Sequence, residues 1–172
     1  TYTITLTINR GEEDESTKSL TFKVYRKENL CPDEATIGTN TSLVAQYPFG
    51  STVRQIISSS IYTVDEIGFE EEAVIESLAW YATYKDGPER MLQIYLKEVD
   101  ENAFEEATTW QDEINDAVLV YQSPDNWKVN SVGWLKIDLT IPFHYSGTKN
   151  LKVMVRSVTT RAGNYKDPGC AY

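Results

Sequence analysis

Residues 73–99, AVIESLAWYATYKDGPERMLQIYLKEV, decide the fold class of this chain. Two runs in it, 73–84 and 91–99, combine aliphatic and aromatic residues over lengths typical of strands, and the segment between them contains the Asp, Gly and Pro of a turn. In the first run Leu78 and Trp80 alternate onto one face, which predicts a place in the core. The stretch therefore predicts two β-strands separated by a turn.

Three further apolar runs follow, each ended by a polar segment: AVLVYQ at 117–122, VGWLKIDLTIPF at 132–143 and LKVMVRSVT at 151–159. The apolar face of the middle run carries Leu135, Ile137, Leu139 and Ile141. Trp134 falls on the opposite face with Lys136 and Asp138. Only 100–116 leaves room for a helical turn, and no amphipathic helix separates the strands. We therefore predict an all-β fold, a two-sheet antiparallel β-sandwich, and not a parallel α/β fold.

Residues 1–30 predict an N-terminal β-hairpin. TYTITLTINRG at 1–11 and SLTFKVYR at 19–26 alternate apolar and polar residues, and the acidic segment between them forms the tip. We expect this hairpin to be a unit of its own, part of a preceding Ig-like module that docks on a sandwich at 31–172. The alternative is that the hairpin completes an edge of the sandwich.

The chain is acidic, with 172 residues and a net charge of −10. Nucleic acid and anionic membrane surfaces are not expected as partners, because both repel such a chain. No apolar run reaches the roughly 18 residues of a membrane-spanning helix, so we expect no membrane insertion. The acidic residues either keep the protein soluble or gather in part around calcium.

The two cysteines, Cys31 and Cys170, lie near opposite ends of the chain. With no C-x-x-C motif and a single histidine, zinc binding and thiol catalysis are not expected. A disulfide between the two would close most of the chain, a stabilisation of about 4–5 kcal/mol in the loop-entropy description. Such a bond needs an oxidising compartment, so we expect an extracellular protein, secreted or on a cell surface.

No catalytic motif is present: the sequence has no G-x-S-x-G, Walker loop, H-E-x-x-H or EF-hand loop. His144 beside a turn is expected to be structural or solvent-facing. Paired carboxylates for glycoside hydrolysis stay open by residue type, but the acidic runs at 12–15 and 70–72 are typical of solvated loops. We therefore expect that the protein is not an enzyme.

Three aromatic residues lie in polar, turn-rich surroundings and are candidates for ligand binding: Trp110, Trp127 and Tyr165. Stacking of a sugar ring needs a flat aromatic face beside hydrogen-bonding side chains, and Asn126 directly precedes Trp127. The alternative is that these rings pack inward and anchor their loops. For Trp134 both interpretations stay open.

A longer series of phrases resembles a known module. IGTNTSLVAQYPFGSTVRQIISSSIYTVDEIG at 37–68 is followed in order by IESLAWYA, LQIYLKEVDENAF, TTWQDEINDAVLVYQ, VGWLKIDLTIPFHYSGTKNLKVMV and AGNY. This series, over roughly 37–165, resembles the cleaved adhesin domains of secreted Bacteroidetes proteins of the gingipain and haemagglutinin type.

The resemblance implies a jelly-roll sandwich without catalytic activity that binds a carbohydrate or a host or surface protein. It also implies structural calcium and attachment to neighbouring domains of a larger protein. The alternative is a structural or stalk module, or a docking domain of a secreted peptidase. Where relatives carry acidic residues this chain has Arg156, Ser157 and Val158, so calcium is not expected at that point.

With this resemblance, the serine-rich stretch 47–62 is not expected to be a linker. We predict an ordered edge segment whose serines face solvent or cap turns. Its apolar side chains would hold it on the sandwich: Tyr47, Phe49, Ile57, Ile61 and Tyr62.

Overall fold

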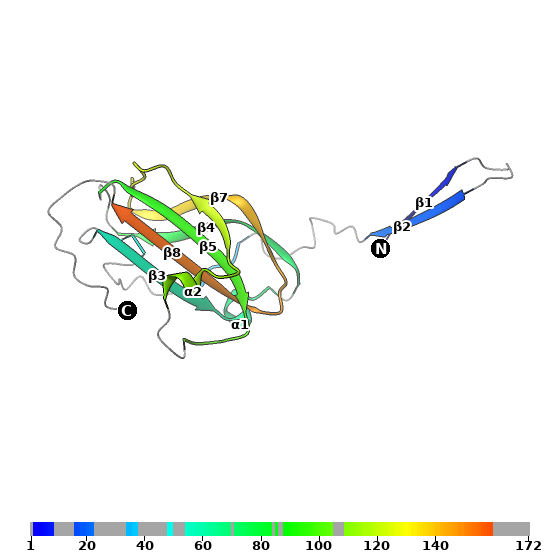
Figure 1. The fold of residues 1–172 in the computed structure, drawn as a ribbon, viewed down its shortest axis with the longest axis horizontal. Helices are drawn as coiled ribbons and strands as arrows, with labels where there is room; N and C mark the ends of the chain where they lie inside the picture. The colour runs from blue at the N-terminus through cyan, green and yellow to red at the C-terminus, as the bar shows by residue number, and fades with distance from the viewer. Residues whose placement is uncertain are drawn as a thin grey trace. The chain divides into compact units, whose positions relative to one another are not determined.

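The computed structural model describes residues 2–8, 16–22, 34–37, 48–49, 54–69, 71–83, 85, 88–104 and 109–159. The chain divides into two compact units, residues 1–34 and 35–172 (Figure 1). In the first unit β1 (Tyr2–Ile8) pairs antiparallel with β2 (Ser16–Phe22), with Tyr2 opposite Phe22 and Ile8 opposite Ser16.

The second unit is built from two antiparallel sheets. One has four strands in the order β3-β8-β5-β6, and the other pairs β4 with β7. The bounds of its strands are β3 Gln55–Tyr62, β4 Ala73–Ala82, β5 Arg90–Val99, β6 Val118–Gln122, β7 Gly133–Tyr145 and β8 Asn150–Thr159. Two single-turn helices, α1 (Val64–Ile67) and α2 (Trp110–Glu113), complete the unit. Most of the described residues lie in antiparallel strands, which confirms the prediction of an all-β antiparallel fold.

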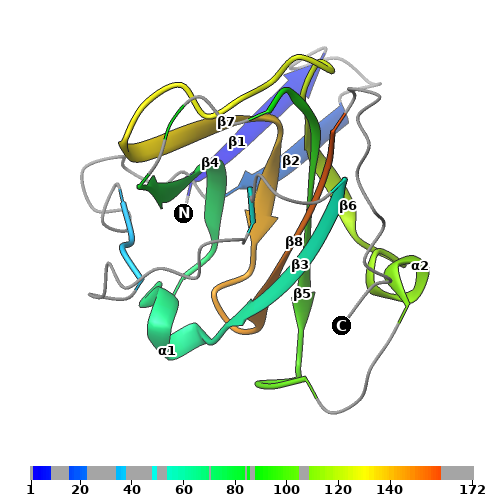
Figure 2. The same cartoon turned by 90° about the vertical axis from the view of Figure 1, so that its left-hand side faces the viewer.

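The strands predicted in 73–99 belong to different sheets. β4 pairs with β7, whereas β5 pairs with β6 and β8, so these consecutive strands are not hydrogen-bonded to each other. Figure 2 shows β4 and β7 on one side of the second unit, with β3, β8 and β5 on the other. The sequence predicted the strands but left their sheet partners open.

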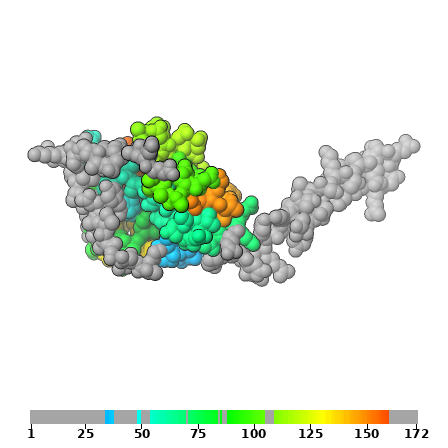
Figure 3. All heavy atoms as spheres, turned by 90° about the horizontal axis from the view of Figure 1, so that it is seen from below, coloured from blue at the N-terminus to red at the C-terminus, as the bar shows by residue number. Residues whose placement is uncertain are grey.

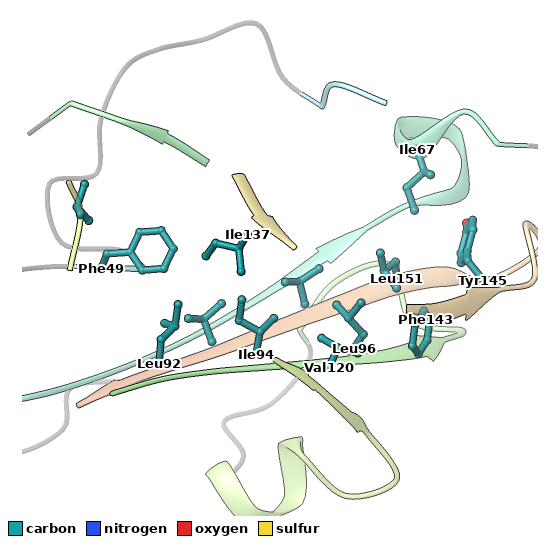
Figure 4. Close-up of a cluster of buried hydrophobic side chains, with 13 residues drawn as sticks. Phe49, Ile67, Leu92, Ile94, Leu96, Val120, Ile137, Phe143, Tyr145 and Leu151 are labelled. Carbon is teal, nitrogen blue, oxygen red and sulfur yellow. The ribbon is translucent and has the colours of Figure 1, made fainter. Parts of the chain in front are cut away.

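A hydrophobic core fills the space between these sheets (Figure 4). Leu92, Ile94 and Leu96 alternate along β5 and are fully buried, and Ile137 faces them from β7. Burial of one such aliphatic side chain contributes roughly 1.5–3 kcal/mol. The prediction for 132–143 is wrong at Ile141, which is 51% exposed. The pairing of β4 with β7 shifts between Ile75 and Ser77, and this irregularity breaks the simple alternation.

The serine-rich stretch contains an edge strand, as predicted: β3 pairs only with β8 among the strands described. Phe49 is buried, but the deepest isoleucine is Ile56, which is 4% exposed, and not the expected Ile57. Among the serines that the structure describes in this stretch, Ser60 is exposed, and Ser58 and Ser59 are half-buried. Tyr47 lies outside the described residues.

A local capping arrangement explains the end of this stretch, TVDEIG at 63–68. The Thr63 side chain accepts from the Glu66 backbone N–H, and the Glu66 carboxylate accepts from the Thr63 backbone N–H at 2.9 Å. Gly68 ends the helix in the left-handed conformation, with φ 70°. A capped turn therefore follows the edge strand directly.

Candidate functional site

Trp127, one of the predicted ligand-binding residues, packs into the molecule. Its ring centroid lies 5.2 Å from that of Phe49, and it contacts the hydrophobic core. Its carbonyl accepts a hydrogen bond from the Arg90 backbone N–H at 2.8 Å, which fixes it at the start of β5. Asn126 beside it is exposed in the preceding turn. Trp127 thus takes the anchoring arrangement that the sequence left open.

Trp110, the second predicted residue, lies on another surface. As the first residue of α2 it contacts Tyr95 of β5 edge-to-face, with ring centroids 5.5 Å apart. Tyr95 alternates with the buried Ile94 and Leu96, so its ring lies on the outer face of the four-stranded sheet. Trp110 and Trp127 therefore contact opposite faces of this sheet and share no binding surface. Tyr165, Cys31 and Cys170 lie outside the described residues.

A different aromatic pair is exposed on the outer face of the two-stranded sheet. Tyr81 of β4 and Trp134 of β7 are directly opposite each other in the pairing register. Their exposed fractions are 44% and 60%, and their rings meet edge-to-face with centroids 5.7 Å apart. Their chain neighbours Trp80 and Leu135 pack against the core, so alternation holds Tyr81 and Trp134 outward.

Polar side chains continue this outer face along β7. Lys136 and Asp138 form an ion pair at 3.2 Å, with side chains 67% and 81% exposed. Ala79 is opposite Lys136 in the register and is exposed. Its side chain is too small to cover the neighbouring aromatic pair. We call Tyr81, Trp134, Lys136 and Asp138 the aromatic platform. Its chemistry suits a flat apolar ring edged with hydroxyl groups, since aromatic faces lie beside a donor and an acceptor.

The sequence contained part of this signal. Trp134, Lys136 and Asp138 were placed together on one strand face, but Tyr81 was not singled out. It could have been found from Trp80, because a residue that follows a buried tryptophan in a strand must point to the other face. The pairing of Tyr81 with Trp134 depends on the β4–β7 register, which no local pattern specifies.

A shallow, open surface depression of about 400 Å³, lined by acidic residues, lies at the C-terminal end of β5. Its carboxylates are Glu98, Asp100, Glu101, Asp112 and Asp116. Glu98 accepts from the Ser146 backbone N–H at 2.7 Å, and Asp100 is ion-paired with Lys149 at 3.1 Å. Among the described residues no group of three or more His, Cys, Asp or Glu side chains could hold a metal ion.

The Tyr145 phenol lies close to these acidic groups. Its hydroxyl donates to the Lys149 carbonyl at 2.7 Å. Burial raises the pKa of Tyr145 above 10.0, and the charge of Glu98 raises it further. Burial also raises the pKa of Tyr121. Both tyrosines are therefore neutral at physiological pH.

His144 is exposed on β7, opposite Val74, in keeping with the solvent-facing role expected for it. Within the described segments, the helices are too short and polar to cross a membrane.

Comparisons with models of protein families, with curated proteins and with solved structures find no match for this chain.

Proposed function

We propose that this chain is a non-catalytic, extracellular carbohydrate-binding module of adhesin type, and that the aromatic platform is its sugar-binding surface. The exposure of Trp134, 60%, next to Tyr81 carries this proposal. Tryptophan is costly to leave in water because of its large apolar area, so an exposed, positioned tryptophan is well suited to a ligand.

The sandwich is proposed to be a jelly roll, with sequence neighbours in different sheets. The separation of β4 and β5, and the return of β8 to lie between β3 and β5, support this topology. The family relationship to cleaved adhesin domains, the calcium and the extracellular location rest on the sequence phrases and the two cysteines.

The platform favours a pyranose whose apolar face stacks on one ring. Since Tyr81 and Trp134 are nearly perpendicular, with an interplanar angle of 87°, only one of the two rings can stack parallel to the sugar while the other borders it. Lys136 and Asp138 would then hydrogen-bond hydroxyl groups at the sugar edge. An open face of this size gives weak monovalent binding, so several copies acting together would be needed for firm attachment.

The test is a glycan array probed with the wild-type protein and with the Trp134→Ala, Tyr81→Ala and Ile141→Ala variants, in calcium and in a chelator. We expect the first two substitutions to weaken binding at least about tenfold, as loss of a central aromatic contact does. Ile141→Ala is the control: Ile141 is 51% exposed on the same strand but lies about 20 Å from Trp134. A blank array with folded wild-type protein would contradict the proposal.

A second candidate is a structural or docking module that binds a neighbouring protein domain. One observation favours it: exposed apolar side chains are present beyond the aromatic pair. They are Val74 of β4, Ile141 of β7 and Val132, which directly precedes β7. A protein interface buries far more area than one sugar, on the order of 800 Å² per partner. Ile141→Ala would then weaken binding as Trp134→Ala does, which separates the two functions.

A further inference from the structure

The outward side chains at the start of β7 form a straight row from Trp134 to Asp138. The pairing with β4 is regular over this stretch, and its register shift lies beyond Ser77, the partner of Asp138. Because each residue of a strand advances the chain by about 3.3 Å, Asp138 lies about 13 Å along the strand from Trp134. The aromatic end of the platform and its acidic end are therefore separated by more than the width of one sugar ring.

The groups that this row offers to a ligand are accessible. Trp134 is 60% exposed, and the side chains of Lys136 and Asp138 are 67% and 81% exposed. Between Tyr81 and Ser77 the outward residue of β4 is Ala79, which carries only a methyl group. The β4 side of the row is therefore open from its aromatic end to its polar end.

The polar end of the row is a pair of opposite charges. Lys136 Nζ lies 3.2 Å from Asp138 Oδ1, so the two charges compensate each other. Their partners in the register, Ala79 and Ser77, carry no charge. An ammonium group donates hydrogen bonds and a carboxylate accepts them, and a sugar hydroxyl can do both. The polar end therefore suits a ligand that has hydroxyl groups and no net charge.

We propose that the pyranose stacked on the aromatic platform is one unit of an uncharged, β-1,4-linked oligosaccharide that lies along β7. One unit would stack at Trp134, and the next would bring its hydroxyl groups to Lys136 and Asp138. A β-1,4-linked chain is extended, as the row is, whereas an α-1,4-linked chain is coiled. With a net charge of −10 the protein repels chains of acidic sugars. This inference rests on the proposed function, because it specifies the ligand of the same platform.

The test is a set of NMR titrations of the whole chain, followed through its backbone and tryptophan indole N–H resonances. The probes are the monosaccharide, disaccharide and trisaccharide of the cello-, manno- and xylo-oligosaccharide series, with maltotriose and trigalacturonate, all at constant ionic strength. In at least one β-1,4-linked series the trisaccharide should bind about tenfold more tightly than the monosaccharide, the gain expected for an added hydrogen bond to a charged group. Maltotriose and trigalacturonate should bind more weakly than that trisaccharide.

Three variants assign the two ends of the bound chain. Asp138→Ala should lower the ratio of trisaccharide to monosaccharide affinity, because it removes the acidic end of the row. Trp134→Ala should weaken the binding of both ligands, because both need the stacking ring. Glu101→Ala removes an exposed acid that follows β5, in the other sheet, and should change neither affinity.

Three results would each overturn the inference: equal affinity for monosaccharide and trisaccharide in every series, an unchanged affinity ratio in Asp138→Ala, or tightest binding of trigalacturonate or maltotriose. If sugars still bind in these cases and Trp134→Ala weakens them, the proposed function stands and only the extended ligand is wrong. If no sugar binds in these titrations or on the glycan array, the proposed function fails as well.

Discussion

The outer faces of the two sheets in the second unit differ in how far they are exposed to solvent. The outer face of the two-stranded sheet leaves Tyr81 and Trp134 in solvent, whereas part of the outer face of the four-stranded sheet is covered by the segment that carries α2. Figure 3 shows this segment, in yellow-green, beside residues of β5 and β8. On the two-stranded sheet, no described segment covers the pair Tyr81 and Trp134. On the four-stranded sheet, Tyr95 pairs with Trp110, which belongs to the covering helix α2.

The two faces also differ in their ion pairs between a lysine and an acidic residue, one of which is buried and the other exposed. α2 brings Glu113 over the sheet, where it forms an ion pair with Lys152 while both side chains are only 10–12% exposed. Ser59 of β3 also donates to this carboxylate, at 3.4 Å. On the other face, Lys136 and Asp138 form an ion pair in solvent. The first pair is therefore a buried structural contact, whereas the second is exposed to solvent.

The largest effect is expected from Glu113→Gln, which leaves the Lys152 charge buried without its counter-ion. Loss of one partner of a buried pair costs about 3 kcal/mol, whereas an exposed pair contributes about 0.5 kcal/mol or less. Urea unfolding should therefore show a large loss of stability for Glu113→Gln and almost none for Asp138→Asn, which removes the exposed acid. Similar losses in the two variants would contradict the distinction between the faces.

A smaller effect separates the two aromatic pairs. Trp110→Ala removes a half-buried ring that packs on Tyr95, and we expect a loss of about 2 kcal/mol in the free energy of unfolding. Trp134→Ala removes a ring that is 60% exposed, and the expected change is within about 0.5 kcal/mol. Thermal unfolding of the two variants, followed by circular dichroism, measures both. Equal destabilisation would mean that Trp134 is a packing residue and would weaken the case for the platform.

Much of the strand content could be predicted from the sequence, because period-two alternation reports burial locally. Leu92, Ile94 and Leu96 show this clearly, and so do Ile137 and its neighbours. The prediction fails at Ile141, since an irregularity in the β4–β7 pairing reverses its exposure without any change in the local pattern. Ile56 and Ile57 are adjacent, and only the phase of β3 on β8 decides which of them is buried.

The candidate site was less predictable because it depends on contacts between distant segments. Trp110 and Trp127 are both in polar surroundings in the sequence, yet each meets a ring from elsewhere in the chain, Tyr95 or Phe49. Polar neighbours indicate a loop but do not say where a loop tryptophan points. Tyr81 became part of the site through its register with Trp134. The local sequence pattern thus predicts on which face of a strand a residue lies. Which residues come together in a site depends on the pairing of the strands.

Among the variants of buried or half-buried side chains, the smallest change in the free energy of unfolding is expected for Tyr145→Phe, which tests whether the inner face of the two-stranded sheet stabilises the fold. Tyr145 is the last residue of β7, is 1% exposed and donates to the Lys149 carbonyl at 2.7 Å. Tyr145→Phe keeps the ring but removes this hydrogen bond, so it should cost about 1 kcal/mol at pH 7. Trp134→Ala, on the outer face of the same strand, is the matched comparison and should cost less.

The pH dependence of this variant has a definite sign. The pKa of Tyr145 is raised above 10.0 in the folded protein, so the neutral phenol favours folding. Its contribution is fully present below pH 10 and is lost as the pH rises through the folded pKa, because the unfolded tyrosine ionises first. Phenylalanine cannot ionise, so the stability difference between wild type and Tyr145→Phe should shrink above pH 10. Urea unfolding curves recorded from pH 7 to 11 measure this difference. Tyr121 is present in both proteins, so its ionisation affects both stabilities equally and cancels. A constant difference across that range would show that Tyr145 ionises equally easily in both states.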